Sequence, residues 1–527
     1  MNELNAHWAN GDEGIPLNSH IANPDVILIG SGVMSSHLGV LLKLLDPRLV
    51  IQVYEVTAGL AEESSDGWNN AGTGHAGICE LSYTPHQLAD GTVPVDKALD
   101  IFEQFECSRQ FWSFATRMGI LNHPRDFLNA LPHISFVHGD QQVDFLKRRF
   151  AAMSKHHFFK QMRFTVDRAT IERWAPLLVA GRDNTPIAAT SMGDGTDVNF
   201  GDLSRKLLRW LARQENCAIA TENRVTDLRK SDGGWELAIK DLKTGETRPN
   251  TGKFVFVGAG GGSLSLLQKS GIEESKGLGG FPIGGQWLVC TNPKIVARHH
   301  SKVYGQALET APTMAVPHLD SRILGGEKKL LFGPFAAWTT KFLQREGSWT
   351  DLPSSVKPDN LLTLCRIGVS NLDLIRYLVQ QGIQSMDDRL ATLRMFYPAA
   401  AAEDWKLIDA GIRVQAIKKT DGEAGIVHYG TEIIASKDRS LSALMGASPG
   451  ASVCVSIALE LIKTCLPHLV SVGEGAERLK KIVPNYGLDL QRSENASLFE
   501  KLHRNAGEAL GLSTEFEDPA SLNLRTA

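Results

Sequence analysis

Near the beginning of the chain, apolar positions form two short runs on either side of a segment with helical spacing. Val26–Ile29 is the first run, the turn Gly30-Ser31-Gly32 follows it, and the second run is Val50–Tyr54. This pattern predicts strand, turn, helix and strand. Glu55 comes directly after the second run. Glycines in the turn and an acid after the next strand are typical of a dinucleotide-binding unit.

The residue types of this unit suit a nucleotide. Glycines let the backbone approach a pyrophosphate, the helix N-terminus offers unpaired N–H groups, and Glu55 can accept hydrogen bonds from ribose hydroxyls. The third glycine of the fingerprint is replaced by Ser35, which is small but weakens the match. Because glycine turns also occur in α/β proteins that bind no nucleotide, the prediction depends on the flanking strands and the acid.

A glycine-rich stretch, Ser64–Pro85, interrupts the periodic pattern after Glu55, and we expect a binding loop there. Residues 96–118 have aromatic side chains at near-helical spacing, which favours core packing over a cofactor contact. Further helices are predicted at Asp144–Lys155, Asp167–Trp174 and Asp202–Gln214. Strands are predicted at Ala218–Thr221, Val225–Arg229, Trp235–Leu242 and Phe254–Val257.

The strand Phe254–Val257 leads into a second glycine cluster, Gly258–Gly262. Two strand-to-glycine junctions so far apart predict a nucleotide domain interrupted by an insertion. Strand-like patterns at Gly285–Cys290, Lys302–Gly305, Thr313–His318 and Lys329–Phe332 indicate an antiparallel sheet. Residues 358–397 look helical, short strands are expected at Ala410–Thr431, and Gly446–Gly450 is expected to open a last long apolar helix.

The fold class is therefore α/β, with a discontinuous Rossmann-type domain and an α+β substrate domain built on an antiparallel sheet. We expect residues 24–95, 190–275 and 400–470 in the nucleotide domain, and 96–189 and 276–399 in the substrate domain. Residues 1–23 are expected to form a flexible leader without the apolar region of a signal peptide, and 471–527 a helical extension.

Composition narrows the class of protein. The 527 residues carry a net charge of −4, which gives no electrostatic reason to expect nucleic acid as a partner. The seven cysteines are scattered and include no C-x-x-C, so neither a disulfide framework nor a metal site is predicted, and a reducing compartment is expected. No run approaches 18 apolar residues, so we expect no membrane span.

The order of motifs is similar to that of the FAD enzymes related to D-amino-acid oxidase and flavin-linked glycerol-3-phosphate dehydrogenase. The motifs are GSGVMS, VNFGDLSRKLL, FVFVGAGGGS, AGIRVQ and GASPGAS. Within that superfamily, NNAGTGHAG, VPHLDSR, LLFGPFAAWTTKFL and LMGASPGAS resemble the malate:quinone oxidoreductase family. The resemblance extends from Pro24 to Leu466.

The resemblance implies noncovalent FAD, with the pyrophosphate at the Gly30 turn and the ribose at Glu55. It places the isoalloxazine between the loop around Asn70–Gly77 and the segment Gly446–Gly450, where a helix N-terminus would stabilise negative charge on a reduced flavin. The implied cofactor residues are Gly30, Ser31, Gly32, Glu55, Asn70, Gly72, Thr73, Gly74, His75, Val225, Gly258, Gly446, Ser448, Pro449 and Gly450.

It further implies oxidation of (S)-malate to oxaloacetate by hydride transfer from C2 to flavin N5, with electrons passed to quinone. This chemistry needs cations for the carboxylates and a base for the hydroxyl proton. Arg413 occupies the place of a substrate-gripping Gly-x-Arg-Pro, although Val414 replaces the proline, and its fork can bind a carboxylate. Lys341 and Arg322 are the candidates for the second carboxylate.

The base is the least determined assignment. Histidine suits the task because its pKa lets it accept a proton near neutral pH. Of sixteen histidines, His428 and His318 rank ahead of His75, since their segments are expected to approach the catalytic face. Asp320 could orient His318 or merely end a strand.

Quinone as electron acceptor rests on the resemblance, which implies a peripheral protein on the cytoplasmic, inner face of the cell membrane. Residues 360–380 and 480–527 are the candidates for a lipid-contacting patch, although core helices show the same pattern. Rival hypotheses are a flavin dehydrogenase for L-lactate or L-2-hydroxyglutarate, an NAD-linked reductase, and a non-catalytic FAD-binding protein. The NAD-linked enzyme is disfavoured because no clear acid follows Gly258–Gly262 at the expected distance.

Overall fold

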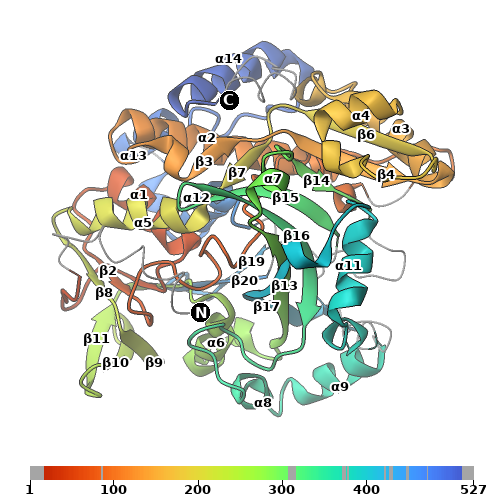
Figure 1. Ribbon diagram of the computed structural model, residues 1–527. Helices are drawn as coiled ribbons and strands as arrows, with labels where there is room; N and C mark the ends of the chain where they lie inside the picture. Colours follow the sequence, from red (N-terminus) through yellow and green to blue (C-terminus); the bar gives the residue numbers. More distant parts are fainter. Residues whose placement is uncertain are drawn as a thin grey trace.

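The structure is a computed structural model that describes residues 17–84, 87–306, 316–370, 376, 379–420, 423–426, 431–446, 450–471 and 473–512. Two sheets, covered by helices, organise the chain (Figure 1). The helices are α1 Val33–Leu45, α2 Asp96–Arg117, α3 Asp140–Met153, α4 Arg168–Trp174, α5 Phe200–Ala212, α6 Ser263–Ser270, α7 Pro293–Val296, α8 Asp351–Ser355, α9 Leu361–Ser370, α11 Met386–Arg394, α12 Cys454–Cys465, α13 Glu474–Ile482 and α14 Ala496–Ala509.

The first sheet has the strand order β19-β20-β12-β1-β2-β8. Its pairs are parallel except β19 with β20. The chain enters it in three separate stretches. Its central strands β1 and β12 are continuous apolar runs because both faces are covered, and the neighbouring β2 has one polar residue, the buried Gln52. These strands are β1 Val26–Ile29, β2 Ile51–Tyr54, β8 Cys217–Ala220, β12 Phe254–Val257, β19 Thr431–Ala435 and β20 Leu441–Gly446.

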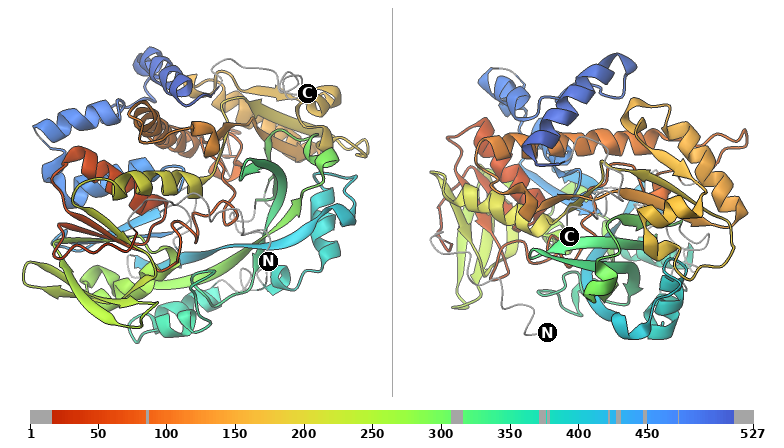
Figure 2. Two further views of the ribbon diagram at one scale, coloured as in Figure 1. Left: turned by 60° about the vertical axis from the view of Figure 1, so that its left-hand side comes forward. Right: turned by 45° about the horizontal axis from the view of Figure 1, so that its top comes forward.

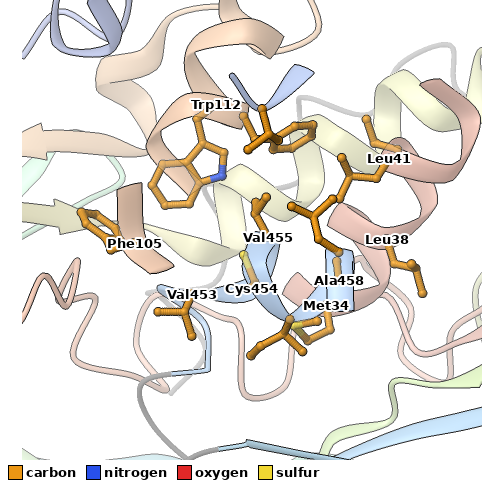
Figure 3. Packing of buried hydrophobic residues seen from close by; sticks show 14 of the residues in the cluster. Met34, Leu38, Leu41, Phe105, Trp112, Val453, Cys454, Val455 and Ala458 are labelled. Carbon is orange, nitrogen blue, oxygen red and sulfur yellow. The ribbon is translucent and has the colours of Figure 1, made fainter. Parts of the chain in front are cut away.

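Alternate residues of β1 enter two different cores. Val26 and Leu28 pack with α1, α2, α5 and α12, and Figure 3 shows the side chains of α1, α2 and α12 meeting around Trp112. Ile27 and Ile29 pack instead with α6 and with a three-stranded antiparallel sheet. That small sheet contains β9 Asn223–Ser231, β10 Gly234–Asp241 and β11 Thr247–Gly252.

The second large sheet has nine strands in the order β18-β17-β13-β16-β15-β14-β4-β6-β5. All of its pairs are antiparallel except β14 with β4. Its strands are β4 His133–His138, β5 Arg163–Thr165, β6 Ile187–Met192, β13 Gly279–Cys290, β14 Lys302–Tyr304, β15 His318–Leu324, β16 Glu327–Ala337, β17 Lys406–Thr420 and β18 Glu423–Ile426. A two-stranded ribbon, β3 Leu128–Ala130 with β7 Thr196–Val198, lies apart from it.

The predicted α/β class and the antiparallel sheet are confirmed, with corrections to several elements. The strand expected at Thr313–His318 begins only at His318, and part of that prediction lies outside the described residues. The short strand β18 lies within Ala410–Thr431, where short strands were expected, but the first part of that range belongs to the 15-residue strand β17, because the long strand β13 pairs with it. The last apolar helix, α12, begins at Cys454 rather than at Gly446–Gly450.

The division into domains stays a prediction. The structure adds that α2, which we expected in the substrate domain, packs against α12 and α14 in the same core as α1. The aromatic residues of α2 serve this core, as expected, and Phe102 contacts Phe499 of α14 with ring centroids 5.7 Å apart. Both views of Figure 2 show α14 on the outside of the molecule, next to α2.

Candidate active site

A cavity of about 680 Å³ is lined by residues of both large sheets. Its volume is within the range of about 300–1,000 Å³ that is usual for small-molecule sites. The carboxyl ends of β1, β2, β12 and β20 open into it, where open α/β sheets bind ligands. The predicted residues that line it are Gly30, Ser31, Gly32, Glu55, Asn70, Gly72, Thr73, His75, Val225, Gly258, Gly446, Gly450 and Arg413.

The turn after β1 can be built only with glycine at its first position. Gly30 has a φ of +94°, and a Cβ there would lie 2.5 Å from the carbonyl oxygen of Gly258. Gly32 is the N-cap of α1 and has no side chain to bond the first turn, where the Val33 N–H donates to the Ser65 hydroxyl at 2.9 Å. Helix α1 therefore begins at the cavity with backbone N–H groups and the positive end of its dipole, the arrangement that binds phosphates.

Ser35, the departure from the glycine fingerprint, is accommodated by a glycine elsewhere. Its side chain is completely buried. A Cβ on Gly258 would lie 2.4 Å from the Ser35 hydroxyl oxygen. Because Gly258 has no side chain, it leaves room for the Ser35 hydroxyl. In the usual fingerprint a third glycine at the position of Ser35 would provide that room.

Glu55 holds the turn as well as lining the cavity. One carboxylate oxygen accepts the Ser31 N–H at 2.7 Å, and the other accepts both the N–H and the hydroxyl of Thr57 at 2.8 Å. Each oxygen of a carboxylate has two acceptor positions, so capacity for a ribose hydroxyl remains on the oxygen facing Ser31. Val225 both lines the cavity and belongs to the core.

The glycine-rich loop predicted at Ser64–Pro85 contains one short 3₁₀ turn, Leu81–Tyr83, and passes along the cavity. It is tied to the segment before α12, since the His75 N–H donates to the Ser452 hydroxyl at 3.1 Å, and that hydroxyl donates to the Thr73 carbonyl at 2.9 Å. The two segments expected to meet at one end of the cofactor site therefore do meet. Gly74 lies outside the lining, because Thr196 occupies the space where its Cβ would be.

Arg322 is completely buried behind this loop, away from the cavity lining. Its guanidinium donates to the carbonyls of Asn70 at 3.1 Å and Gly67 at 3.0 Å, and its Nε lies 3.1 Å from the Asp197 carboxylate. These partners lie on all three nitrogens of the guanidinium group. The structure therefore makes Arg322 a support for the loop, in contrast to the predicted role as a carboxylate ligand.

Arg322 belongs to a larger buried charge cluster. Lys302 Nζ lies 3.0 Å from Asp197 and 3.5 Å from Asp320, and donates to the Ala71 carbonyl at 2.9 Å. Burial alone would raise the pKa of Asp320, but His318 and Lys302 lower it to about 2. The cluster fastens the loop to β7, β14 and β15.

Arg413 lies on β17 and lines the cavity. The neighbouring Gly411 allows β17 to approach the loop closely, because a Cβ there would lie 2.7 Å from the Asn69 carbonyl oxygen. Burial lowers the pKa of Arg413 from its usual value, but an arginine stays charged. Within the described part of the chain Arg413 has no ion-pair partner, so its fork is available to an anionic ligand.

The structure treats the three candidate histidines differently. His75 is partly buried and lines the cavity, and desolvation by the surrounding protein, with His133 and His318 nearby, lowers its pKa to about 3, so the ring is neutral near pH 7. His318 stands outside the lining, with its Nδ1 2.8 Å from Asp320 and its ring stacked on Tyr304 at 4.3 Å. Asp320 thus orients His318 from within β15. His428 lies outside the described residues, as do Ser448 and Pro449.

Lys341 also lies outside the cavity lining, although the following Phe342 is part of it. Its ammonium is 5.5 Å from the centre of the exposed Trp349 ring. Lys341 is half-buried and lies beside an exposed ring outside the lining, a position that does not favour a ligand of the second carboxylate.

Four residues near Arg413 and His75 were missed from the sequence. The Glu80 carboxyl and the phenols of Tyr83 and Tyr304 lie within electrostatic reach of Arg413. The rings of Tyr83 and Tyr304 both contact His75 edge-on, at 5.9 and 6.1 Å. Lys97, in the first turn of α2, lies 5.6 Å from the Tyr83 ring centre. The sequence offered one signal for two of them: Glu80 and Tyr83 lie at the end of the glycine-rich loop that we expected to bind a ligand.

Comparison with known proteins identifies the relatives of this chain. A family profile described as malate:quinone oxidoreductase (Mqo) matches residues 22–512. A probable malate:quinone oxidoreductase 2 of Pseudomonas aeruginosa is 49% identical over 500 residues, covering 95% of this chain and 98% of the relative. A probable malate:quinone oxidoreductase of Halalkalibacterium halodurans is 47% identical over 492 residues, covering 93% and 97%.

Solved structures with the same fold are more distant in sequence. The L-alpha-glycerophosphate oxidase of Mycoplasma pneumoniae, solved with FAD bound, has a TM-score of 0.54 at 16% identity, covering 86% of this chain and 96% of the oxidase. The glycine oxidase of Geobacillus kaustophilus has a TM-score of 0.54 at 15% identity, covering 85% and 95%. These likenesses show a shared fold. The match over nearly the whole length of the sequence shows more: the chain belongs to the malate:quinone oxidoreductase family.

Proposed function

We propose that the protein is an FAD-dependent dehydrogenase that oxidises (S)-malate to oxaloacetate and passes the two electrons to a quinone. The observation that carries the proposal is the continuity of one cavity from the helix start at Gly32 to Arg413, which has no ion-pair partner among the described residues. Membership of the malate:quinone oxidoreductase family supports both substrates.

The residues around the cavity fit FAD. The Gly30 turn and the N-terminus of α1 would receive the pyrophosphate, Glu55 the ribose, and Val225 the adenine. The glycine-rich loop and the segment before α12 would enclose the isoalloxazine. When bound, FAD supplies the two-electron acceptor for the C2–H bond of the substrate.

The protein's own residues would bind and orient malate. The Arg413 fork would hold one carboxylate through paired charge-assisted hydrogen bonds. His75 would accept the hydroxyl proton as C2 is oxidised, because it is the one candidate histidine among the described residues that lines the cavity. Its lowered pKa makes it a weak base in the empty site, and the negative charge of a bound malate would raise that pKa. Tyr83 and Tyr304 would fix the position of the His75 ring.

Lys97 is our candidate for the second carboxylate, in place of Arg322 and Lys341. It lies at the start of α2 beside the Tyr83 ring, which in turn contacts His75, although Lys97, like Lys341, is outside the cavity lining. Malate differs from lactate by this carboxylate. Lys97→Gln should therefore raise KM for malate without changing the rate with lactate, if lactate reacts at all.

We further propose that the protein works on the inner face of the cell membrane. The quinone in the family name supports a membrane location, since respiratory quinones dissolve in the bilayer. All seven cysteines are free, which supports a reducing compartment.

The test is an anaerobic absorbance spectrum of the purified protein, recorded before and after addition of malate, with L-lactate and L-2-hydroxyglutarate in parallel. We expect malate to bleach the flavin band and a soluble quinone analogue to restore it without NAD. If another hydroxy acid bleaches the band and malate does not, that acid is the substrate in place of malate. A folded protein without flavin would overturn the cofactor, and a bound flavin that no hydroxy acid bleaches would indicate a binding protein.

His75→Asn and His428→Asn, assayed side by side, test the base. Loss of bleaching in the His75 variant alone would support the assignment made above. Loss in the His428 variant alone would transfer the role to that residue.

A further inference from the structure

The exposed large apolar side chains of the described residues are concentrated in one segment. Eight of the fifteen lie between residues 338 and 383. We call these the apolar rim. Among its members Leu362, Val369 and Ile383 are 61%, 71% and 76% exposed, and Trp338, Trp349 and Leu361 are at least half exposed. Scattered exposed apolar residues are normal, but a concentration of this kind marks an interaction surface.

Helix α9 lacks the polar outer side of a usual amphipathic helix, because apolar residues lie on both its buried and its exposed side. Leu361, Leu362, Cys365 and Val369 follow helical spacing on its exposed side. A second set, including Thr363 and Ile367, is buried against the protein. A helix that is apolar on both sides needs a second apolar environment for its outer side.

The rim extends beyond α9. A Cβ on Gly382 would lie 3.6 Å from the Trp338 Cβ, so Trp338 adjoins the segment that contains Ile383. In Figure 1, α8 and α9 follow one another along the lower edge of the molecule, and both views of Figure 2 place them on the outside.

The charges within the rim are arranged for an anionic partner. Each described acid of the segment already has a partner within the protein. Asp351 accepts the N–H groups of Phe342 and Ser348, and Asp359 accepts the Gly277 N–H. Glu346 forms an ion pair with Arg224. The cations Lys341, Lys357 and Arg366 have no ion pair with any residue that the structure describes. Tryptophans and cations beside exposed aliphatic residues are the composition of a surface that lies in the lipid headgroup region.

We propose that the apolar rim docks the protein on a lipid bilayer that carries anionic headgroups. The choice of a membrane as the partner rests on the proposed function, because the quinone is dissolved there. The rim also adjoins the site, since Phe342, Leu343 and Lys357 of the same segment line the cavity.

The C-terminal region, the other candidate from the sequence, offers much less exposed apolar surface. Its exposed large apolar residues within the described range are Leu488 and Leu498. Phe499 and Leu510 of α14 are buried against the core that contains α2. In Figure 1, α13 and α14 lie on the upper side, opposite α8 and α9. A membrane under α9 would therefore leave the C-terminal helices in water.

The test is flotation of the full-length protein with vesicles of phosphatidylcholine, with and without phosphatidylglycerol. Leu362→Glu/Val369→Glu places two charges on the rim at exposed positions, where folding should tolerate them. Met118→Glu/Leu242→Glu is the matched control, since both residues are exposed and lie elsewhere. We expect the rim variant to bind anionic vesicles at least ~10-fold more weakly than the wild type, and the control to bind like the wild type. Arg366→Gln should weaken binding by roughly 3-fold, and less at high salt.

Malate oxidation with a water-soluble quinone analogue should be unchanged in the rim variant, which separates docking from catalysis. Equal vesicle binding by the rim variant and the wild type would overturn the proposal, as would a wild type that binds no vesicle. Both outcomes would leave the proposed function standing if the soluble assay succeeds. A wild-type dimer that the rim variant converts to a monomer, without vesicle binding, would assign the rim to a second copy instead.

Discussion

Arg413 and Arg322 stand on strands of the same nine-stranded sheet, yet their surroundings have opposite characters. Arg322 is surrounded by acceptors, with Asp197 and the carbonyls of Gly67 and Asn70 occupying its fork. Arg413 faces the cavity without a carboxylate partner among the described residues. A cation whose hydrogen bonds are already made stabilises the fold, whereas a desolvated cation with an unoccupied fork is ready for an anionic ligand.

The largest effect should follow from replacing Arg322, whose guanidinium already has its partners within the protein. Arg322→Leu leaves the buried Asp197 without its arginine and releases two loop carbonyls. We expect the free energy of unfolding to fall by about 3–5 kcal/mol, because Asp197 keeps only Lys302 as a cationic partner and two carbonyls lose their donors inside a buried cluster. Urea unfolding followed by tryptophan fluorescence measures the change.

The control for this variant is Arg229→Leu, whose side chain is 79% exposed beside Asp227. It should cost less than about 1 kcal/mol. An Arg322 variant of wild-type stability with a raised KM for malate would reverse our comparison and return Arg322 to the substrate.

Arg413→Gln should show the opposite combination of effects. We expect kcat/KM for malate to fall by about 100-fold to 1,000-fold, because truncating one partner of a desolvated charge pair costs about 2–5 kcal/mol. The unfolding free energy should change by less than about 1 kcal/mol, since Arg413 has no ion pair with any residue that the structure describes. Steady-state kinetics and urea unfolding on the same preparation separate the two quantities. Rapid loss of folded protein would mean that Arg413, too, is structural.

A smaller effect concerns two desolvated histidines, one inside the cavity lining and one outside it. Desolvation lowers the pKa of His75 to about 3 and that of His133 to about 4, against about 6.5 in an unfolded chain. Between about pH 6.5 and 4 the unfolded chain binds more protons than the folded one. Stability therefore falls as the pH is lowered, by about 1.4 kcal/mol per pH unit for each such histidine.

His75→Asn and His133→Asn should reduce this pH dependence by similar amounts, measured by urea unfolding at several pH values. Only His75→Asn should also abolish malate oxidation, since His133 does not line the cavity. If both variants kept their activity, the base would have to be sought elsewhere, with His428 first.

The same contrast explains which predictions from sequence succeeded. The Gly30 turn, α1 and β2 are set by neighbours along the chain, so the periodicity and the glycines were sufficient to predict them. The role of Arg322 depends on contacts with residues over a hundred positions away, such as Asp197 and Gly67, and a single sequence contains no signal for them. A strand-end arginine looks the same whether its partner is a carbonyl or a substrate.

Only part of the region around Arg413 and His75 was predicted, because some of its residues are also brought there by contacts distant in sequence. Arg413 could be placed through the Gly411-Ile412-Arg413 motif, and the loop through its glycines. Tyr304 of β14 adjoins the His75 ring and Lys97 of α2 adjoins the Tyr83 ring, and nothing in their local sequence distinguishes them from core or surface residues. The long strand β17 was divided into short ones because its length comes from pairing with β13.

The smallest effect should come from replacing Lys341, the third predicted carboxylate ligand. Its side chain belongs neither to the buried charge cluster of Arg322 nor to the cavity lining that contains Arg413. Its ammonium lies over the exposed ring of Trp349, where water screens the charge and no buried partner depends on it. Lys341→Gln should therefore change both the unfolding free energy and kcat/KM with a soluble quinone analogue by no more than about 0.5 kcal/mol, or roughly 2-fold. A 100-fold loss of kcat/KM would show that the side chain turns inward when malate binds, and that a surface cation can complete the site that Arg413 begins.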